Sequence, residues 1–563
     1  MSHQILDTNF KYKDIPWNDY PRPNLVRNSY LNLNGLYDYM VTREHMTNKF
    51  LGKVMVPFPI ESKLSLVEKT LKKGEYLFYH KDVTLDPQFI KDKLLLHFGA
   101  VDNISDIYIN NIHAYHHEGG YLPFSFDIKK YLKDTHFSLL IRVKDDMDLN
   151  FPYGKQKIKR GGMWYTKISG IWQTVWLESV DEKYIKNIII TPDIDKSEVN
   201  LKIISDATSF IIKYENKVIK TREKEITLKI DNLHLWSPED PYLYDLVIST
   251  DNDLVRSYFA MRKFSVKNGK MELNNKPYFF NGLLDQGYFS DGIFLPASSE
   301  GYLNDIKTMK SLGFNTLRKH IKIEPLTFYY LCDKLGMIVW QDMVNNSRYS
   351  FLFDTVFPTI GIKRKFDKYS HISKKSREIF ISHTIETILH LYNFPSIALW
   401  TIFNEGWGQF NAKFLYKKVK ELDNTRFIDT CSGWFETKYS DVISKHVYFK
   451  KLKFKGNYLK PLVLSEFGGY AYKIANHSFN LDKTFGYKKF KDQSSFQADL
   501  IRLYQEEVIP AIKNNNLNAA IYTQVSDVED ETNGLFTYDR MILKVDKDII
   551  VDLMSKVKFD VKK

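Results

Sequence analysis

Residues 398–410 decide the fold of this chain, and they read Ala398-Leu-Trp-Thr-Ile-Phe-Asn404-Glu405-Gly-Trp407-Gly-Gln-Phe410. An apolar run stops abruptly at Asn404-Glu405, glycines and Trp407 follow, and a helical pattern resumes at Asn411. A buried parallel strand that carries a carboxylate to its C-terminal end has this form. The segment therefore predicts a buried strand with Glu405 at its mouth.

The same pattern occurs a second time, in Pro461-Leu-Val-Leu-Ser-Glu466-Phe-Gly-Gly469. Two carboxylates at strand ends of one chain suggest a pair that shares a pocket. Glycoside hydrolysis requires such a pair, because a protonated carboxyl must supply a proton to the leaving oxygen while an ionised one acts at the sugar carbon. Buried carboxylates at strand ends are seldom without a function.

The composition indicates a large globular chain. Its 563 residues suggest about three domains. Aromatic residues make up 15%, which suits both β-rich cores and sugar platforms. The net charge of +12 raises the alternative of a nucleic-acid partner. Because the lysines form no dense run, we interpret the charge as a lysine-rich surface and predict no nucleic-acid binding.

Two cysteines, Cys332 and Cys431, lie far apart, so neither a disulfide framework nor a Cys-based metal site is predicted. The first residues lack the charged and apolar regions of a signal peptide. No run of eighteen apolar residues occurs, which predicts no membrane span. The expectation is a cytoplasmic protein, with a homo-oligomer left open.

Three regions follow one another along the chain. Residues 1–180 contain short alternating strands separated by Asn, Gly, Asp and Pro, with Asn110-Asn111 as a hairpin turn, which predicts a β-sandwich. Residues 181–262 contain further short strands and predict a small immunoglobulin-like sandwich, interpreted as a spacer.

Residues 263–563 alternate strands with amphipathic helices, which is typical of a parallel α/β fold. The predicted helices include 303–312, 324–335 and 376–391. Eight strands in about 300 residues fit a (β/α)8 barrel, with Glu405 ending the fourth strand and Glu466 the seventh. The predicted strands lie near residues 278–283, 314–318, 337–341, 397–403, 427–430, 444–448, 461–465 and 518–524.

Nearly the whole chain resembles glycoside hydrolase family 2, the family of β-galactosidases, β-glucuronidases and β-mannosidases. The motifs that carry the resemblance occur in the family's order: Tyr20-Pro-Arg-Pro-Asn, Gly119-Gly-Tyr-Leu-Pro-Phe, Ser169-Gly-Ile-Trp-Gln-Thr-Val-Trp, Leu235-Trp-Ser-Pro-Glu-Asp-Pro-Tyr, Leu312-Gly-Phe-Asn-Thr-Leu-Arg-Lys-His, Phe403-Asn-Glu405 and Leu464-Ser-Glu466-Phe-Gly-Gly. The resemblance implies a jelly-roll sugar-binding domain, an immunoglobulin-like domain and a C-terminal TIM barrel.

The resemblance also implies roles for the two carboxylates. Glu405 occupies the place of the family's general acid/base and Glu466 that of its nucleophile. Family members retain the anomeric configuration, which requires the carboxyl groups to lie about 5–5.5 Å apart. Asn404 is placed to bind the sugar 2-hydroxyl. Partial burial against Trp407, together with the charge of Glu466, is expected to keep Glu405 protonated at rest.

Further residues at strand ends are candidates for substrate binding. The resemblance implies an arginine and a histidine that line the sugar site at the end of the second strand, where a guanidinium would hold the nucleophile ionised. It also implies a tyrosine at the end of the sixth strand that donates a hydrogen bond to the nucleophile. For each candidate, a satisfied polar group or a core aromatic is an equally weighted alternative. These candidates, with Trp407 after the fourth strand, are Asp285, Arg318, His320, Asp342, Trp434, His446, Tyr448 and Gln524.

Departures from the family pattern affect the pocket walls. Asn281-Gly-Leu-Leu-Asp285 stands where many members carry a histidine motif, and Gln524 stands where many place a tryptophan. No Asn-x-Lys signature of glucuronidases and no acidic metal cluster of large β-galactosidases is recognisable, so no metal or other cofactor is predicted.

The favoured hypothesis is a retaining exo-β-glycosidase, most similar to β-galactosidases, that acts on an oligosaccharide or glycoconjugate. A β-glucuronidase, a β-mannosidase and a non-catalytic carbohydrate-binding protein are the alternatives, because fold alone does not establish activity. The sequence leaves open the sugar, the aglycone, the oligomeric state and the pathway.

Overall fold

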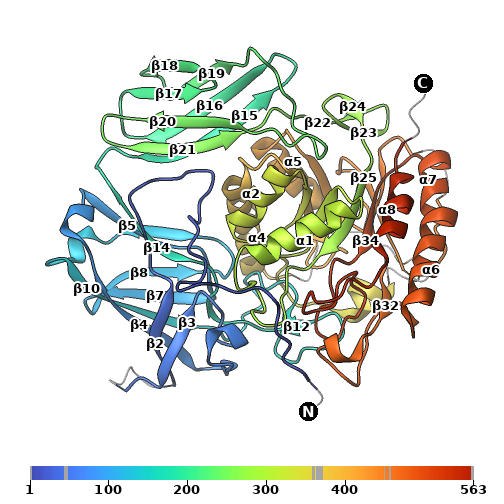
Figure 1. The fold of residues 1–563 in the computed structure, drawn as a ribbon, viewed down its shortest axis with the longest axis horizontal. Helices are drawn as coiled ribbons and strands as arrows, with labels where there is room; N and C mark the ends of the chain where they lie inside the picture. The colour runs from blue at the N-terminus through green and yellow to red at the C-terminus, as the bar shows by residue number, and fades with distance from the viewer. Residues whose placement is uncertain are drawn as a thin grey trace.

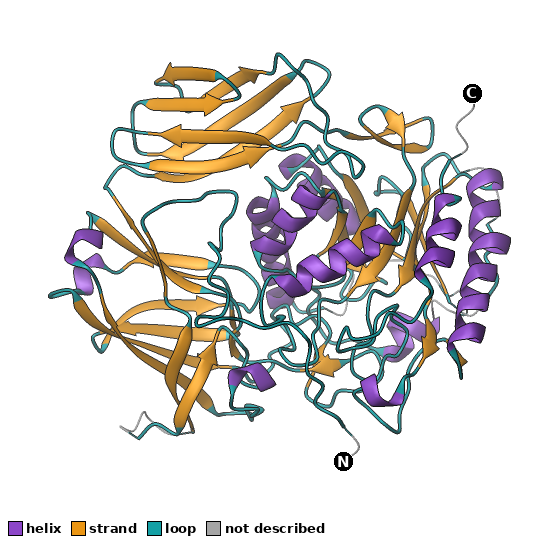
Figure 2. Ribbon diagram, in the orientation of Figure 1, coloured by secondary structure: helices purple, strands orange, loops and turns teal. Residues whose placement is uncertain are grey.

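A computed structural model of the chain describes residues 3–43, 49–357, 360, 362, 372–448, 450–454 and 458–559. Two β-sandwiches, drawn in blue and green, lie beside a barrel whose elements run from yellow-green to red (Figure 1). Helices surround the barrel and are nearly absent from the sandwiches (Figure 2). This confirms the predicted multidomain fold; the exact domain boundaries stay predictions.

The N-terminal sandwich consists of two antiparallel sheets that enclose an apolar core including Leu77, Leu96 and Ile141. Asn110 and Asn111 join two of its strands with φ of 51° and 64°, the left-handed pair that a two-residue hairpin turn requires. In spatial order, one sheet contains β3 (Gly52–Val56), β2 (Gly35–Thr42), β4 (Tyr76–Thr84), β10 (His136–Lys144), β7 (Ile104–Ile109) and β8 (Ile112–Glu118); the other contains β1 (Tyr30–Asn32), β14 (Val175–Val180), β5 (Lys93–Phe98) and β9 (Phe124–Asp127).

The second sandwich also has two antiparallel sheets, packed over isoleucine, leucine and valine side chains. One sheet contains β15 (Ile185–Asp193), β16 (Glu198–Ser205) and β19 (Glu225–Lys229); the other contains β18 (Lys217–Thr221), β17 (Phe210–Tyr214), β20 (Tyr244–Ser249) and β21 (Leu254–Phe259).

The barrel contains the eight predicted parallel strands. In chain order they are β25 (Phe280–Asp285), β26 (Thr316–Lys319), β27 (Ile338–Asp342), β28 (Ile397–Asn404), β29 (Phe427–Ser432), β30 (Ile443–Val447), β31 (Leu462–Gly468) and β34 (Leu517–Thr523). The sheet runs β29-β28-β27-β26-β25-β34-β31-β30, so its two ends are consecutive strands and the barrel is nearly closed. The C-terminal strand ends, where barrels of this type carry their active sites, therefore meet in one place.

Local sequence explains the helix boundaries. Helix α2 (Leu326–Leu335) begins after Pro325 and ends at Gly336, which adopts a left-handed φ of 70°. Helix α4 (Lys374–Leu391) begins two residues before the predicted start, because the Ser373 side chain caps it by accepting from the Ser376 N–H. The other barrel helices are α1 (Glu300–Ser311), α5 (Ala412–Leu422), α6 (Gln493–Leu503), α7 (Ile509–Asn514) and α8 (Lys547–Ser555).

Residues 149–168, here called the N-terminal arm, leave the first sandwich and dock on the barrel mouth. The Tyr153 N–H donates to Asn345 O at 3.1 Å, and its hydroxyl donates to Ser347 O at 2.8 Å. At the other end of the arm, the Thr166 N–H donates to Glu529 Oε1 at 2.8 Å. Through the arm, the first sandwich contributes residues to the mouth of the barrel, beside the C-terminal ends of its strands.

Both cysteines are buried, and neither forms a disulfide. Across the described ranges, no helix is long and apolar enough to cross a membrane.

Candidate active site

Glu466 lies in β31 and points into the barrel mouth, with 6% of its side chain exposed. Its Oε1 accepts from Arg318 Nη1 at 2.9 Å, and the Tyr448 hydroxyl donates to its Oε2. Two imidazoles stand slightly farther away: His446 Nε2 is 3.6 Å and His320 Nδ1 is 3.9 Å from Oε1. Both oxygens of this carboxylate are therefore held by donors.

Arg318, in β26, is the fully buried centre of this network. Its Nε and Nη2 donate to the two oxygens of Asp342, each at 3.0 Å, which is the bidentate geometry that favours arginine over lysine. Nη2 also donates to Asn404 Oδ1 at 2.9 Å and to Ser432 Oγ at 3.1 Å. One guanidinium thus links β26, β27, β28, β29 and β31.

The charges around Glu466 set its ionisation. Burial alone would raise its pKa, but His446, Arg318 and His320, together with the Tyr448 hydrogen bond, hold the pKa well below its ordinary value. Glu466 is therefore an anion throughout the neutral range.

Asp342 is the second fixed anion of this network. Burial opposes its charge, yet Arg318 and His320 keep its pKa below the usual range. His320 Nδ1 lies 2.8 Å from Asp342 Oδ2, and burial lowers the pKa of His320 despite that bond. Both Asp342 oxygens are engaged by Arg318 and His320, and sugar binding by Asp342 stays a prediction.

Glu405 has a more open environment. It follows β28 with a left-handed φ of 52°, and its N–H donates to Ser432 O at 3.1 Å. The side chain is 17% exposed, and its Oε1 lies 2.8 Å from His446 Nδ1. The unusual backbone conformation of a non-glycine residue is common at functional sites.

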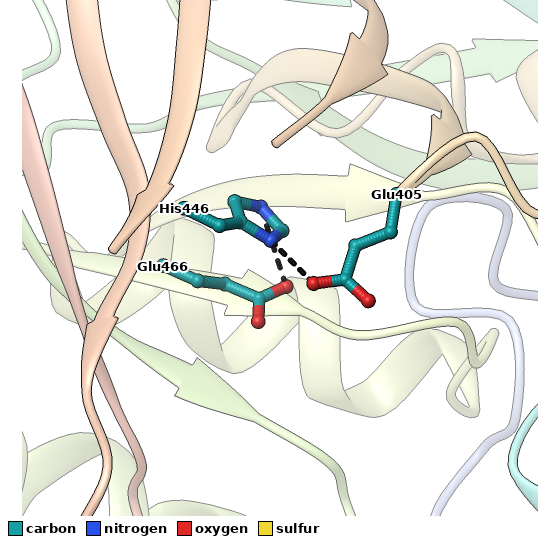
Figure 3. A group of neighbouring side chains, drawn as sticks. All are labelled: Glu405, His446 and Glu466. Atoms are coloured by element: carbon teal, nitrogen blue, oxygen red, sulfur yellow. Dashed lines mark hydrogen bonds and ion pairs between the residues drawn. The ribbon is translucent and has the colours of Figure 1, made fainter. Parts of the chain in front are cut away.

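Glu405, His446 and Glu466 converge on one point (Figure 3), with one donor atom of each lying within 4.8 Å of the others. A histidine and two carboxylates are a donor set that could hold a metal ion. Here Arg318 and Tyr448 already occupy the oxygens of Glu466. The absence of a metal stays a prediction.

Asn404 presents its amide group beside the pair. Its Oδ1 accepts from Arg318 Nη2 and from Ser432 Oγ, each at 2.9 Å. This fixes the amide orientation, and Nδ2 donates no hydrogen bond within the described part of the chain. The amide N–H groups are thus available to a ligand.

Asp285 and Trp407 contact other partners. Asp285 is bound by Lys319 Nζ at 2.7 Å and by the Gly287 N–H, in a separate network. Trp407 is buried between the arm residues Tyr153 and Trp164. Sugar contact by Asp285 and Trp407 stays a prediction.

Trp434 and Gln524 keep some capacity to bind a ligand. Trp434 stands edge-on to His446, with ring centroids 5.7 Å apart, and its buried Nε1 has no acceptor among the described residues. Gln524 Nε2 donates to Asn533 Oδ1 at 2.8 Å and to Glu531 Oε2 at 3.2 Å, whereas its Oε1 is buried and unsatisfied.

Sequence reasoning missed the contributions of Ser432, Tyr487, Glu531 and Lys155. Tyr487 stacks on Tyr448 with centroids 3.8 Å apart, and Glu531 accepts from the arm hydroxyl of Tyr165. Lys155 is half-buried in the arm, and its positive charge favours a lower pKa of both Glu531 and His320. Ser432 ends a barrel strand and could have been found by that position, but the arm residues carry no local signal of where they dock.

Comparisons with known families agree with this geometry. The family described as "Glycosyl hydrolases family 2, TIM barrel domain" matches residues 264–545. Its sugar binding domain matches residues 50–180, and a third model, "Glycosyl hydrolases family 2", matches residues 193–262. The three matches follow the order of the barrel and sandwiches described above.

Curated relatives include a β-galactosidase of Thermoanaerobacter pseudethanolicus, 26% identical over 62% of this chain and 48% of the relative. A β-glucuronidase of Rattus norvegicus is 23% identical over 70% of this chain and 68% of the relative. The chain spans about half the length, or less, of the first β-galactosidases that it matches.

Solved structures share the fold at low identity. A β-D-glucuronidase of Dictyoglomus thermophilum superposes with a TM-score of 0.75 at 19% identity, covering 95% of this chain and 98% of that one. A β-galacturonidase of Eisenbergiella tayi gives 0.71 at 16% identity, covering 96% and 99%. Since the barrel match alone extends over half of the sequence, the chain belongs to glycosyl hydrolase family 2.

Proposed function

We propose that this chain is a retaining exo-β-glycosidase, most similar to β-galactosidases, that removes a terminal β-linked sugar from an oligosaccharide or glycoconjugate. The observation that carries the proposal is the approach of one Glu405 oxygen to within 4.8 Å of one Glu466 oxygen. Retaining enzymes hold their carboxyl groups about 5–5.5 Å apart, whereas inverting enzymes leave about 6.5–9.5 Å for a water molecule.

The surroundings of the two carboxylates support a division of roles. Glu466, ionised and fully bound by donors, attacks the anomeric carbon while Glu405 gives its proton to the glycosidic oxygen, so that the aglycone leaves as an alcohol. In the second step Glu405 takes a proton from water, the water oxygen bonds to the anomeric carbon, and Glu466 is released as a carboxylate. Asn404 Nδ2 donates to the sugar 2-hydroxyl.

A β-glucuronidase is the second candidate, and Lys155 favours it. This half-buried ammonium forms no ion pair within the described ranges. Its charge, together with burial, lowers the pKa of the nearby His320 imidazole. An acidic sugar would supply the missing carboxylate. Against it, the Glu531 carboxyl stands near the same lysine.

The test is a set of initial rates on aryl β-galactoside, β-glucuronide, β-mannoside, β-glucoside and α-L-arabinoside substrates. The proposal expects turnover with the galactoside fastest. A glucuronide that is fastest, and whose advantage disappears in Lys155→Met while galactoside turnover survives, would favour the second candidate.

A 2-deoxy-2-fluoro glycosyl fluoride of the preferred sugar should label Glu466, and mass spectrometry of the peptide would locate the label. Turnover without a covalent intermediate would contradict the retaining mechanism. No turnover of any substrate and no label would favour the non-catalytic carbohydrate-binding protein.

A further inference from the structure

His446 occupies an unusual position between the two carboxylates. It lies in β30 with its side chain fully buried, and its two ring nitrogens face different partners. Nδ1 is 2.8 Å from Glu405 Oε1. Nε2 is 3.3 Å from Arg318 Nη1 and 3.6 Å from Glu466 Oε1 (Figure 3).

The partners of the ring determine which nitrogen carries the proton. A guanidinium only donates hydrogen bonds, so Nε2, 3.3 Å from Arg318 Nη1, can meet it only with its lone pair. Arg318 Nη1 also donates to Ser465 O and Glu466 Oε1, and Glu466 Oε1 is 3.6 Å from Nε2, too far for an Nε2–H to bond there instead. The proton of the neutral imidazole then resides on Nδ1 and points at Glu405 Oε1. A doubly protonated ring would place an Nε2–H against the guanidinium N–H, which is repulsive.

The ring has little freedom to turn away. Gly433, with a φ of 81°, passes so close that a Cβ there would lie 2.7 Å from the His446 ring. Trp434 contacts the ring edge-on and Tyr448 lies on the same strand end. The contact to Glu405 is therefore fixed by packing, although Glu405 itself is partly exposed.

We propose that His446 is the positioning residue of the acid/base carboxylate: its Nδ1–H keeps Glu405 Oε1 as an acceptor, so that the transferable proton is carried by Oε2. This rests on the proposed glycosidase function. When Oε2 gives its proton to the leaving oxygen, the charge that develops on Glu405 strengthens the Nδ1–H···Oε1 bond. This assistance is therefore largest for leaving groups that need protonation, and it adds to the effect of His446 on the charge of Glu466.

The test compares three variants on aryl β-galactosides whose phenols range from 2,4-dinitrophenol to 4-methoxyphenol. His446→Asn can retain a donor near the Nδ1 position, His446→Gln moves the donor toward the Nε2 position, and His446→Leu has none. For Leu and Gln we expect kcat/KM to fall about 10–100-fold further with methoxyphenol than with dinitrophenol, with which the loss reports only the effect of His446 on Glu466. Asn should recover most of the loss.

An equal loss with every leaving group, or equal behaviour of Asn and Gln, would overturn the proposal. If Leu does not fold, the Asn and Gln pair still decides. In the wild type, ¹⁵N–¹H correlation of labelled histidine, with His446→Asn identifying the signal, should show the Nδ1–H form at neutral pH; an Nε2–H form would also overturn it. Absent turnover and absent labelling of Glu466 in the wild type would instead refute the glycosidase function.

Discussion

Glu466 and Glu405 both lie at the mouth of the barrel, but their environments differ. Glu466 sits inside β31 and is bound by a buried guanidinium and a tyrosine, with two imidazoles within 4 Å. Glu405 sits outside β28, is three times as exposed and meets a single imidazole. One carboxylate is surrounded by donors and the other is open to a ligand, and the proposed double displacement needs such a difference.

The largest expected effect follows from removing the fixed anion. Glu466→Gln keeps the shape and loses the nucleophile, so kcat/KM should fall by about 10⁴-fold, which corresponds to about 5 kcal/mol. Glu178→Gln is the matched control, because Glu178 is also a buried glutamate bound by arginine, at 2.8 Å from Arg27, but in the first sandwich. It should lose stability and keep kcat. A loss below about tenfold in Glu466→Gln would contradict the assignment of Glu466 as the nucleophile.

The next effect tests whether Arg318 keeps Glu466 ionised. Arg318→Lys retains the charge but cannot donate to Asp342, Glu466 and Asn404 together, so we expect about 10³-fold lower kcat/KM and about 2–4 kcal/mol less stability. Arg426→Lys, at a buried arginine paired with Asp423 at 2.8 Å, should lose similar stability without the catalytic loss. Equal activity of the two variants would contradict a role for Arg318 at the reacting groups.

Glu405→Gln should affect activity in proportion to the need for a proton. With unactivated leaving groups we expect about 10²–10³-fold lower kcat/KM, and with dinitrophenol much less, because that phenol leaves without protonation. Added azide should restore turnover by attacking the glycosyl-enzyme, giving a glycosyl azide of unchanged anomeric configuration. Glu421→Gln, on the exposed side of α5, should behave as wild type. A loss independent of leaving group would remove the contrast between the carboxylates.

The barrel and its carboxylate pair could be predicted because their signals are local. A fully buried parallel strand is a continuous apolar run, and a glutamate that interrupts or follows the run is visible in the sequence. Glu405 follows β28, and Glu466 lies inside β31, which continues two residues beyond it. The hairpin at Asn110-Asn111 was predictable for the same reason, since two adjacent asparagines tolerate a left-handed backbone.

What could not be predicted depends on contacts between distant segments. The contacts of Trp407 with Tyr153 and Trp164 of the arm join segments that are distant in the sequence, and they carry no local signal. The contact of Asp285 with Lys319 becomes apparent only when β25 and β26 pair. The orientation of the His446 ring likewise depends on Arg318, which lies 128 residues away.

Tyr448→Phe should give the smallest loss of activity among these variants. Its pH profile should separate the ionisation of Glu466 from that of Glu405. The Tyr448 hydroxyl donates to Glu466 Oε2 and helps to lower the pKa of that carboxyl, so its loss should raise the pKa. Because the ionised form, and with it the activity, exists above this pKa and is lost as the pH falls through it, the acidic limb of kcat/KM should move to higher pH. We expect about tenfold lower activity at the optimum. Tyr37→Phe, at a buried tyrosine of the first sandwich bound to Leu33 O, should leave the pH profile unchanged. If only the basic limb moved, the hydroxyl would be acting on Glu405, and the separation of the two carboxylates would fail.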